Sequence, residues 1–197
     1  SVILPPEQVN ATWAQGGGSA SKSYGHLALS SKPSEVWSAS IAGSTQRARL
    51  AASPVVGDGR LYVIDTRGVV HAFNVETGSE VWTKSFKVSG EDEKSIFGGG
   101  VSFDGGKVFV TTGVGEVAAL DARTGRQCRD FGRNGQVRIT DGMGQVRPGY
   151  VSINSPPTIV RGVIVTGHQV LDGKDRWAPS GVIQAYDAVT GEMRWAW

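Results

Sequence analysis

Several features on which common functions depend are scarce in this sequence. One cysteine, Cys128, among 197 residues excludes an internal disulfide and a zinc site built from several cysteines. No apolar run approaches the ~20 residues that span a bilayer as a helix. Lysine and arginine form no run that would follow a nucleic-acid backbone, and the formal net charge is +2. The sequence therefore predicts neither a membrane span nor nucleic-acid binding.

Residues that form catalytic or metal sites are equally sparse. The three histidines, His26, His71 and His168, lie far apart in the chain and lack the spacing of metal ligands. No arrangement of serine, histidine and aspartate suggests an activated nucleophile. The sequence therefore predicts no catalytic residue and no metal site from its residues alone.

Glycine, in contrast, is abundant. The chain has 28 glycines, while 39% of its residues are hydrophobic and the apolar runs stay short. This combination is typical of short strands joined by many tight turns, and it argues against long helices. The fold class expected is all-β.

One hairpin pattern occurs three times. Each copy has an apolar strand that ends in Asp or Asn, and then a Thr-Gly turn whose glycine can adopt positive φ. The copies are Ala72–Trp82, Ala119–Arg126 and Ala185–Trp195. A second hairpin precedes each copy, with turns at Gly57–Gly59, Asp104–Gly106 and Arg161–Gly162. The pattern predicts four-stranded antiparallel meanders, which are the blades of a β-propeller.

The repeat also predicts how the chain is divided. Residues 1–50 are an N-terminal segment with an outer blade strand at Glu35–Ile41, 51–94 a blade, 95–150 a blade plus a loop, and 151–197 a blade with an inserted loop. In the first complete blade the expected strands are Ala52–Val56, Arg60–Asp65, Val69–Asn74 and Glu80–Lys87.

Three tryptophans, Trp37, Trp82 and Trp195, occupy equivalent places in the repeat. A blade has two apolar faces and must pack between neighbours. A tryptophan ring can lie on the turn glycine of the next blade while its N–H finds a carbonyl. These residues are therefore expected to dock blade to blade, whereas Trp177 falls in an inserted loop.

The repeats, with Asp or Asn, Thr-Gly and Trp in register, resemble the propellers of pyrroloquinoline-quinone-dependent dehydrogenases and of the outer-membrane assembly lipoprotein BamB. The segments most similar to BamB-like proteins are Gly25–Leu29, Trp37–Ile41, Ala51–Val56 and Gly113–Asp121. Those that resemble membrane-type quinoprotein glucose dehydrogenases are Leu120–Gly125, Asp130–Gly132, Arg147–Tyr150, Ser155–Thr158 and Ser180–Asp187. This change suggests a chimera, natural or engineered, joined within the shared hairpin at residues 121–125.

The resemblance has consequences for assembly and ligands. Both families build rings of about twice as many blades as this chain supplies, so a half-propeller is expected that completes its ring by homodimerisation. In the dehydrogenases, pyrroloquinoline quinone and calcium lie on the ring axis. The positions that the resemblance places nearest that cofactor are Asn154, Ser155, His168 and Gln169, and the insertion adds Asp172 and Asp175 as possible calcium ligands.

Three interpretations remain open at this stage, and the third, a purely structural product of recombination that binds no ligand, cannot be separated from the first by sequence. The first is a non-catalytic propeller scaffold or protein-interaction module, with no cofactor, that binds itself and, by resemblance, peptides or outer-membrane assembly proteins. The alternative is a fragment of a pyrroloquinoline-quinone-dependent sugar or alcohol dehydrogenase that retains weak quinone binding. Both families act in or facing the periplasm, which is therefore the expected location.

Overall fold

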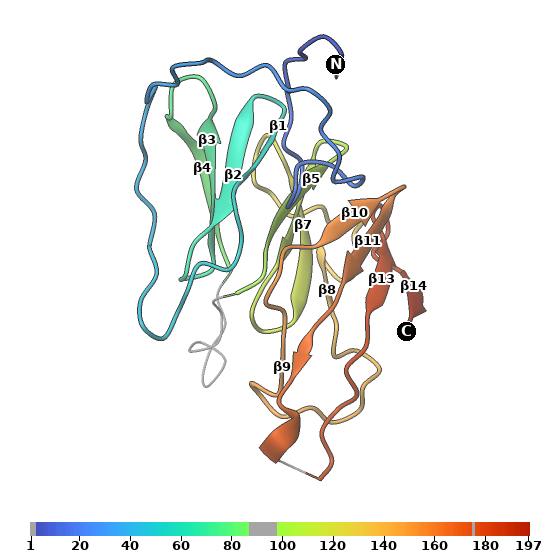
Figure 1. Cartoon of the computed structure of the whole chain (residues 1–197). Coiled ribbons are helices and arrows are strands. Elements are labelled where there is room, and N and C mark those ends of the chain that lie inside the picture. Colours follow the sequence, from blue (N-terminus) through green and yellow to red (C-terminus); the bar gives the residue numbers. More distant parts are fainter. Residues whose placement is uncertain (1–2, 87–97, 175) are drawn as a thin grey trace.

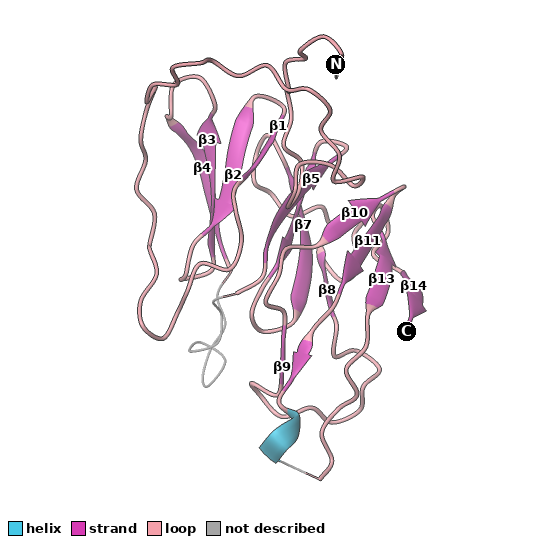
Figure 2. Ribbon diagram, in the orientation of Figure 1, coloured by secondary structure: helices cyan, strands magenta, loops and turns pink. Residues whose placement is uncertain are grey.

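The computed structural model describes residues 3–86, 98–174 and 176–197, and in this part of the chain it contains three four-stranded antiparallel sheets (Figures 1 and 2). The first sheet comprises β1 (Val55–Gly57), β2 (Arg60–Ile64), β3 (Val69–Asn74) and β4 (Glu80–Ser85). The second comprises β5 (Gly100–Asp104), β6 (Lys107–Thr111), β7 (Glu116–Asp121) and β8 (Gln136–Arg138). The third comprises β10 (Thr158–Val160), β11 (Val163–Thr166), β13 (Gln184–Asp187) and β14 (Met193–Ala196).

Two small elements complete the structure. Strand β9 (Val151–Ser152) pairs with β12 (Gln169–Val170), and the 3₁₀ turn η2 (Asp172–Lys174) follows. The prediction of an all-β fold with four-stranded antiparallel blades is confirmed. Lys87, the expected end of the fourth strand, and the expected boundary between residues 94 and 95 lie outside the described residues.

The first turn of each sheet explains why the strands pair in this register. Asp58 and Gly59 both have positive φ, 49° and 68°, as a type I′ turn requires. Arg161 and Gly162, at 49° and 73°, repeat this conformation in the third sheet. Type I′ turns match the right-handed twist of the flanking strands, so the first two strands of these sheets form tight hairpins.

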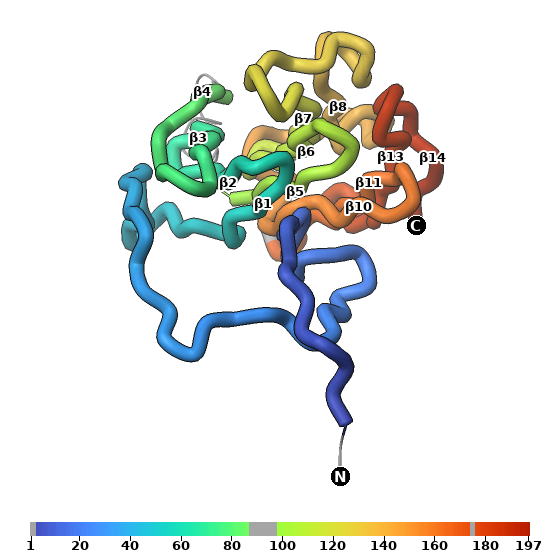
Figure 3. The backbone as a smooth tube through the Cα atoms, turned by 90° about the horizontal axis from the view of Figure 1, so that it is seen from above, coloured from blue at the N-terminus to red at the C-terminus, as the bar shows by residue number. Residues whose placement is uncertain are grey.

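The three sheets are arranged as a fan, with β1, β5 and β10 toward its inside and β4, β8 and β14 toward its rim (Figure 3). The middle sheet is buried on both faces because it packs between the other two sheets. Successive residues of a strand point to opposite faces, so β7 contributes to both contacts. Along β7, Ala118 and Leu120 pack in the apolar cluster shared with the first sheet. Val117 and Ala119 pack in the cluster shared with the third.

Tryptophans lie at the outer contacts between sheets. The Trp82 ring lies on Gly125, where an added Cβ would come within 2.6 Å of it, and Trp82 Nε1 donates to Ala122 O at 3.0 Å. Trp37 has the same relation to Gly78, and its Nε1 donates to Val75 O at 2.8 Å. Trp195, on β14, is 46% exposed.

The fourth strand of the second sheet differs from the pattern of the repeat. After the turn at Gly125 the chain pairs only briefly with β7, where Cys128 N donates to Ala119 O at 2.9 Å, and then leaves the sheet until β8 begins. We call residues 129–135 the excursion. Its Phe131 is fully buried, and Gly132 N donates to Thr190 O of the third sheet at 2.7 Å. The excursion thus makes the contact with the next turn that tryptophan makes elsewhere.

The N-terminal segment crosses the inner strands of all three sheets. Trp13 exchanges two backbone hydrogen bonds with Val56, and Phe103 N donates to Ala14 O at 2.6 Å. The Gln15 side chain then bonds both the N–H and the C=O of Ile159.

One difference from the expected strands concerns residues 35–41, all of them described, which form no strand. In the described part of the chain they pair with no strand, and Trp37 contacts the first sheet through Gly78 and Val75.

The last hairpin carries an acid-sensitive turn. Asp187 Oδ2 accepts a hydrogen bond from Arg194 Nη2 at 2.6 Å, and its Oδ1 accepts from the backbone N–H groups of Thr190 and Val189. The Arg194 guanidinium, together with these backbone donors, holds the pKa of Asp187 well below its usual range. The ionised carboxylate is therefore the form that the folded state prefers.

We expect the substitution Arg194→Gln to reduce the loss of stability in acid. A depressed carboxylate pKa contributes stability above the unfolded value of about 3.9, and this contribution disappears as the pH falls through the folded value. Without Arg194 the two values move closer, so the free energy of unfolding changes less between about pH 6 and about pH 3. Urea unfolding at both pH values measures this change. Arg67→Gln, an exposed arginine on another turn, is the control, and equal acid dependence in all three proteins would contradict the assignment.

Candidate functional site

Long loops gather at one end of the fan. They comprise residues 139–157 after β8 and residues 167–183 between β11 and β13, and the short turn at residues 112–115 joins β6 to β7 beside them. We call this end the loop face, and it lies toward the bottom of Figure 1, around β9 and η2. Loops held by a rigid sheet are where binding residues usually lie.

A cavity of about 360 Å³ lies on the loop face, and we call it the central cavity. The residues that line it come from the segment before β1, from the residue pair before β5, and from the segments that contain β9 and β12: Arg49, Ala51, Gly98, Gly149, Ser152, Asn154 and Gln169. Arg49 contributes its cation from the segment before β1. Asn154 Nδ2 donates a hydrogen bond to Gln169 Oε1.

Local structure explains why these side chains meet. Gln169 lies opposite Ser152 in the β9–β12 pair, so both are held on one wall. Gly98 has a φ of 110°, and a Cβ there would lie 3.0 Å from Ile153 O and 3.5 Å from Asn154 Oδ1. A glycine at this point therefore lets the two connections approach closely and leaves room at the Asn154 amide.

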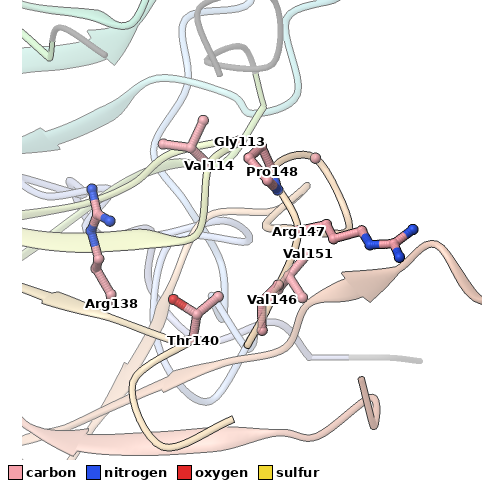
Figure 4. Close-up of a pocket in the computed structure, with 9 residues that line it drawn as sticks. Gly113, Val114, Arg138, Thr140, Val146, Arg147, Pro148 and Val151 are labelled. Atoms are coloured by element: carbon pink, nitrogen blue, oxygen red, sulfur yellow. The ribbon is translucent and has the colours of Figure 1, made fainter. Parts of the chain in front are cut away.

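A second cavity, of about 190 Å³, adjoins the first through Gly149. Arg138 and Arg147 lie on opposite sides of it, and Thr140 and Val146 lie between them (Figure 4). Arg138 Nη2 is 3.2 Å from an oxygen of Glu116, a side chain that is almost fully buried. This ion pair neutralises a carboxylate that burial would otherwise destabilise.

A third cavity shares Arg147 with the second and is lined by aromatic side chains. Its walls include Tyr150 and Trp177, and its volume is about 330 Å³. The guanidinium carbon of Arg147 lies 5.8 Å from the centre of the Tyr150 ring, which is within cation–π range. The three cavities are therefore neighbours on the loop face, because Gly149 lines the first two and Arg147 lines the second and third.

The structure brings together two of the four cofactor-binding residues expected from the resemblance. Asn154 and Gln169 line the central cavity. Ser155 does not line it: its backbone carbonyl accepts a hydrogen bond from Thr111 Oγ1 at 2.9 Å. His168 Nε2 lies 3.4 Å from both Ser180 O and Val182 N, so this side chain holds the inserted loop together. His168 Nδ1 is buried without a hydrogen-bond partner among the described residues.

Sequence reasoning missed five residues that line the central cavity: Arg49, Ala51, Gly98, Gly149 and Ser152. Arg49 stands in a polar stretch, Arg47-Ala48-Arg49, that carries no motif. The resemblance could have pointed to Gly149, because Arg147–Tyr150 is one of the dehydrogenase-like segments. Ser152 belongs to a strand of two residues, which is too short to give a periodic signal.

Other kinds of site find no support in the described part of the chain. It holds no group of three or more His, Cys, Asp or Glu residues that could bind a metal, and no helix long and apolar enough to cross a membrane. Asp172 lies exposed in η2, and Asp175, its expected companion, is outside the described residues. Burial raises the pKa of the Cys128 thiol, so this cysteine is protonated and a poor nucleophile at neutral pH.

Known proteins are similar to this chain in sequence and architecture. The family model "PQQ: Glucose/ethanol/alcohol dehydrogenase, beta-propeller domain" matches residues 33–197. The chain is 36% identical over 172 residues to the glycerol dehydrogenase large subunit of Gluconobacter oxydans (strain 621H). The alignment covers 79% of this chain and 22% of that relative. A quinohemoprotein alcohol dehydrogenase from Comamonas testosteroni is similar in structure, with a TM-score of 0.58 and 30% identity over 77% of this chain and 21% of that one. BamB from Moraxella catarrhalis has a TM-score of 0.45 and 18% identity.

These matches bear on the two functions that the sequence left open. The family match runs without interruption across residues 121–125, where a junction was expected, and a chimera is not needed to explain it. The relatives are named as dehydrogenases, so the expectation that the chain is a non-catalytic scaffold has less support than its alternative. The chain spans about a fifth of the length of these relatives. It belongs to the β-propeller family of pyrroloquinoline-quinone glucose, ethanol and alcohol dehydrogenases.

Proposed function

We propose that this chain is part of the propeller of a pyrroloquinoline-quinone-dependent dehydrogenase, and that its central cavity holds part of the quinone. The observation that carries the proposal is the meeting of Arg49, Asn154 and Gln169 around one cavity on the loop face. The relatives' names include glycerol, quinate/shikimate and glucose as substrates, so polyols, sugars and related alcohols are the substrate class proposed.

The chemistry of the cavity fits this cofactor. The quinone is a flat ring system with three carboxyl groups, which are ionised at neutral pH. A guanidinium such as that of Arg49 binds a carboxylate with two parallel hydrogen bonds. The side-chain amides of Asn154 and Gln169 add neutral donors and acceptors, and none of the residues lining the central cavity is acidic. The lining would therefore attract the carboxylates and repel none of them.

Calcium would need more ligands than this cavity provides. Calcium takes six to eight oxygen ligands, often from carboxylates. The described residues lining the cavity offer side-chain oxygens from Asn154, Gln169 and Ser152. We propose that the rest of a calcium shell comes from blades outside this sequence. When bound, the quinone accepts electrons from the alcohol substrate, while the residues of this chain orient its ring and neutralise its carboxylates.

Three expectations stay predictions. The expected cofactor-binding role of Ser155 and His168 is one of them, although neither residue lines the central cavity. Closure of the ring by a second copy of the chain is to be measured as the molar mass in solution by light scattering. The periplasmic location rests on the family resemblance alone.

The substitution Arg49→Gln is expected to weaken the binding of pyrroloquinoline quinone at least tenfold. A hydrogen bond to a charged group contributes about 1.5 to 3 kcal/mol, and about 1.4 kcal/mol corresponds to a factor of ten. Titration of the protein with quinone, followed by the quenching of tryptophan fluorescence, measures the dissociation constant. Thermal unfolding with and without quinone gives a second readout, because a ligand that binds the folded form raises its stability.

The matched control is Arg133→Gln, which removes the same charge from an exposed arginine of the excursion. We expect its quinone affinity to stay within about twofold of the unmodified chain. If both substitutions weakened quinone binding equally, the effect of Arg49→Gln would come from the change in net charge and not from a contact in the central cavity. An unchanged affinity of Arg49→Gln would place the quinone elsewhere and overturn the assignment of the central cavity.

A further inference from the structure

The rim of the fan carries a basic groove between the first and second sheets, on the opposite edge from the inner strands. Its volume is about 770 Å³, and its walls are Lys84, Arg126, Gln127, Arg129 and Asn134. Lys84 comes from β4, and the other four come from the turn after β7 and from the excursion. β4 and β8 are the outermost strands of these neighbouring sheets (Figure 3).

The groove exists because the fourth strand of the second sheet is interrupted. β4 continues for six residues along the rim, whereas the chain opposite it leaves the sheet after Cys128. Trp82 and Lys84 lie on the same face of β4, since they are two residues apart in a strand. Trp82 closes the contact at Gly125, and Lys84 faces the gap beyond it, where Lys84 Nζ donates to Gln127 Oε1 at 3.3 Å.

The charge of the groove is positive and uncompensated. Three of its five lining residues are cations, and none is acidic. Across residues 3–86, 98–174 and 176–197, no carboxylate forms an ion pair with Lys84, Arg126 or Arg129. The surrounding segment, residues 123–138, contains five arginines and one aspartate, in a chain whose net charge is only +2. The positive charge is thus concentrated on one stretch of the rim.

We propose that this groove binds an acidic, extended segment of a partner protein. Carboxylates of such a segment would pair with Lys84, Arg126 and Arg129. Its backbone could follow β4, which is an edge strand of its sheet and so has one side unpaired by the sheet itself. A lipid surface fits less well, because membrane-binding faces combine basic with apolar side chains, and every side chain that lines this groove is polar.

The test uses the whole chain and a fluorescein-labelled hexaglutamate peptide, with hexaglutamine as the neutral probe. Fluorescence anisotropy at low ionic strength measures the dissociation constant. We expect the triple variant Lys84→Gln, Arg126→Gln, Arg129→Gln to bind hexaglutamate at least tenfold more weakly than the unmodified chain. Added salt should weaken the binding further in the unmodified chain, because exposed ion pairs are screened. Hexaglutamine should not bind.

The matched control is Arg67→Gln, Arg123→Gln, Arg133→Gln, which removes the same charge from exposed arginines that do not line the groove. We expect its affinity to stay within about twofold of the unmodified chain, and thermal unfolding of both variants verifies that they are folded. Equal weakening by the two triple variants would overturn the proposal in favour of a general charge effect. A lipid surface is tested by sedimentation with vesicles of equal parts phosphatidylcholine and phosphatidylglycerol. If the chain sedimented with these vesicles but did not bind hexaglutamate, the proposal would be overturned in favour of a lipid surface.

Discussion

Replacing Gly125 by alanine is expected to lower the free energy of unfolding by about 3 to 5 kcal/mol. Gly125 has a φ of 70°, which an L-residue adopts at a cost of about 1 to 2 kcal/mol. Its new methyl group would also come within 2.6 Å of the Trp82 ring. The ring must then move, and the hydrogen bond from Trp82 Nε1 to Ala122 O is strained or lost. Urea unfolding followed by tryptophan fluorescence measures the change.

Gly105→Ala is the control that separates the two causes. Gly105 also has a positive φ, 53°, but a Cβ added there meets no atom within 4 Å. Only the backbone cost remains, so we expect a loss of about 1 kcal/mol. If Gly125→Ala and Gly105→Ala cost the same, the contact with Trp82 contributes nothing to the packing of the first sheet on the second.

Phe131→Ala is expected to cost about 4 kcal/mol, because a large ring would be removed from a fully buried site. Phe131 lies in the apolar cluster between the second and third sheets, with its ring centre 6.0 Å from that of Phe109. The cavity that remains would also loosen the excursion, which bonds to Thr190 through Gly132 N. Denaturant unfolding measures the loss of stability.

The control for this prediction is Val189→Ala, on the turn of the third sheet that faces the excursion. Val189 is 63% exposed, so its truncation should change the free energy of unfolding by less than about 0.5 kcal/mol. A cost below about 1 kcal/mol for Phe131→Ala would contradict its role as the anchor of the excursion.

Gly125→Ala and Phe131→Ala test two different ways in which neighbouring sheets pack at their outer contacts. A turn glycine at each outer contact leaves a flat backbone surface for the preceding sheet. Trp37 and Trp82 cover Gly78 and Gly125 with indole rings. At Gly191 the backbone of Gly132 takes this place, because an added Cβ would lie 2.6 Å from Gly132 N. The excursion supplies the buried ring separately, through Phe131, and in leaving the sheet it opens the basic groove on the rim.

Much of the fold follows from local signals in the sequence. The Thr-Gly turns and their aspartates predict the hairpins because the side chain of Asp or Asn bonds the turn N–H groups, as Asn74 does with Thr77 N at 3.0 Å. The sequence of β7 shows no alternation of apolar and polar residues, because both faces of this strand are buried. The excursion was not predicted, because the chain after Gly125 lacks the tryptophan of the other copies and carries no other signal for where pairing resumes.

The candidate site was predicted only in part. Asn154 and Gln169 were found through resemblance, and the structure places both at the central cavity. Arg49 was missed because it precedes the first strand by several residues, and no local pattern links it to a loop more than a hundred residues later. An outer blade strand was also expected at residues 35–41, and the structure shows no strand there. The sequence of this segment resembles an outer strand, but a strand forms only where a neighbouring strand supplies its hydrogen bonds.

The sequence by itself determined the all-β class, the four-stranded units and the turns between their strands, since these depend on residues close together in the chain. The tertiary structure alone decided which connections meet at the central cavity, how Phe131 and Gly132 replace a tryptophan, and where the basic groove opens. These features depend on the stacking of sheets, which joins residues distant in sequence through packing and hydrogen bonds that no local pattern encodes.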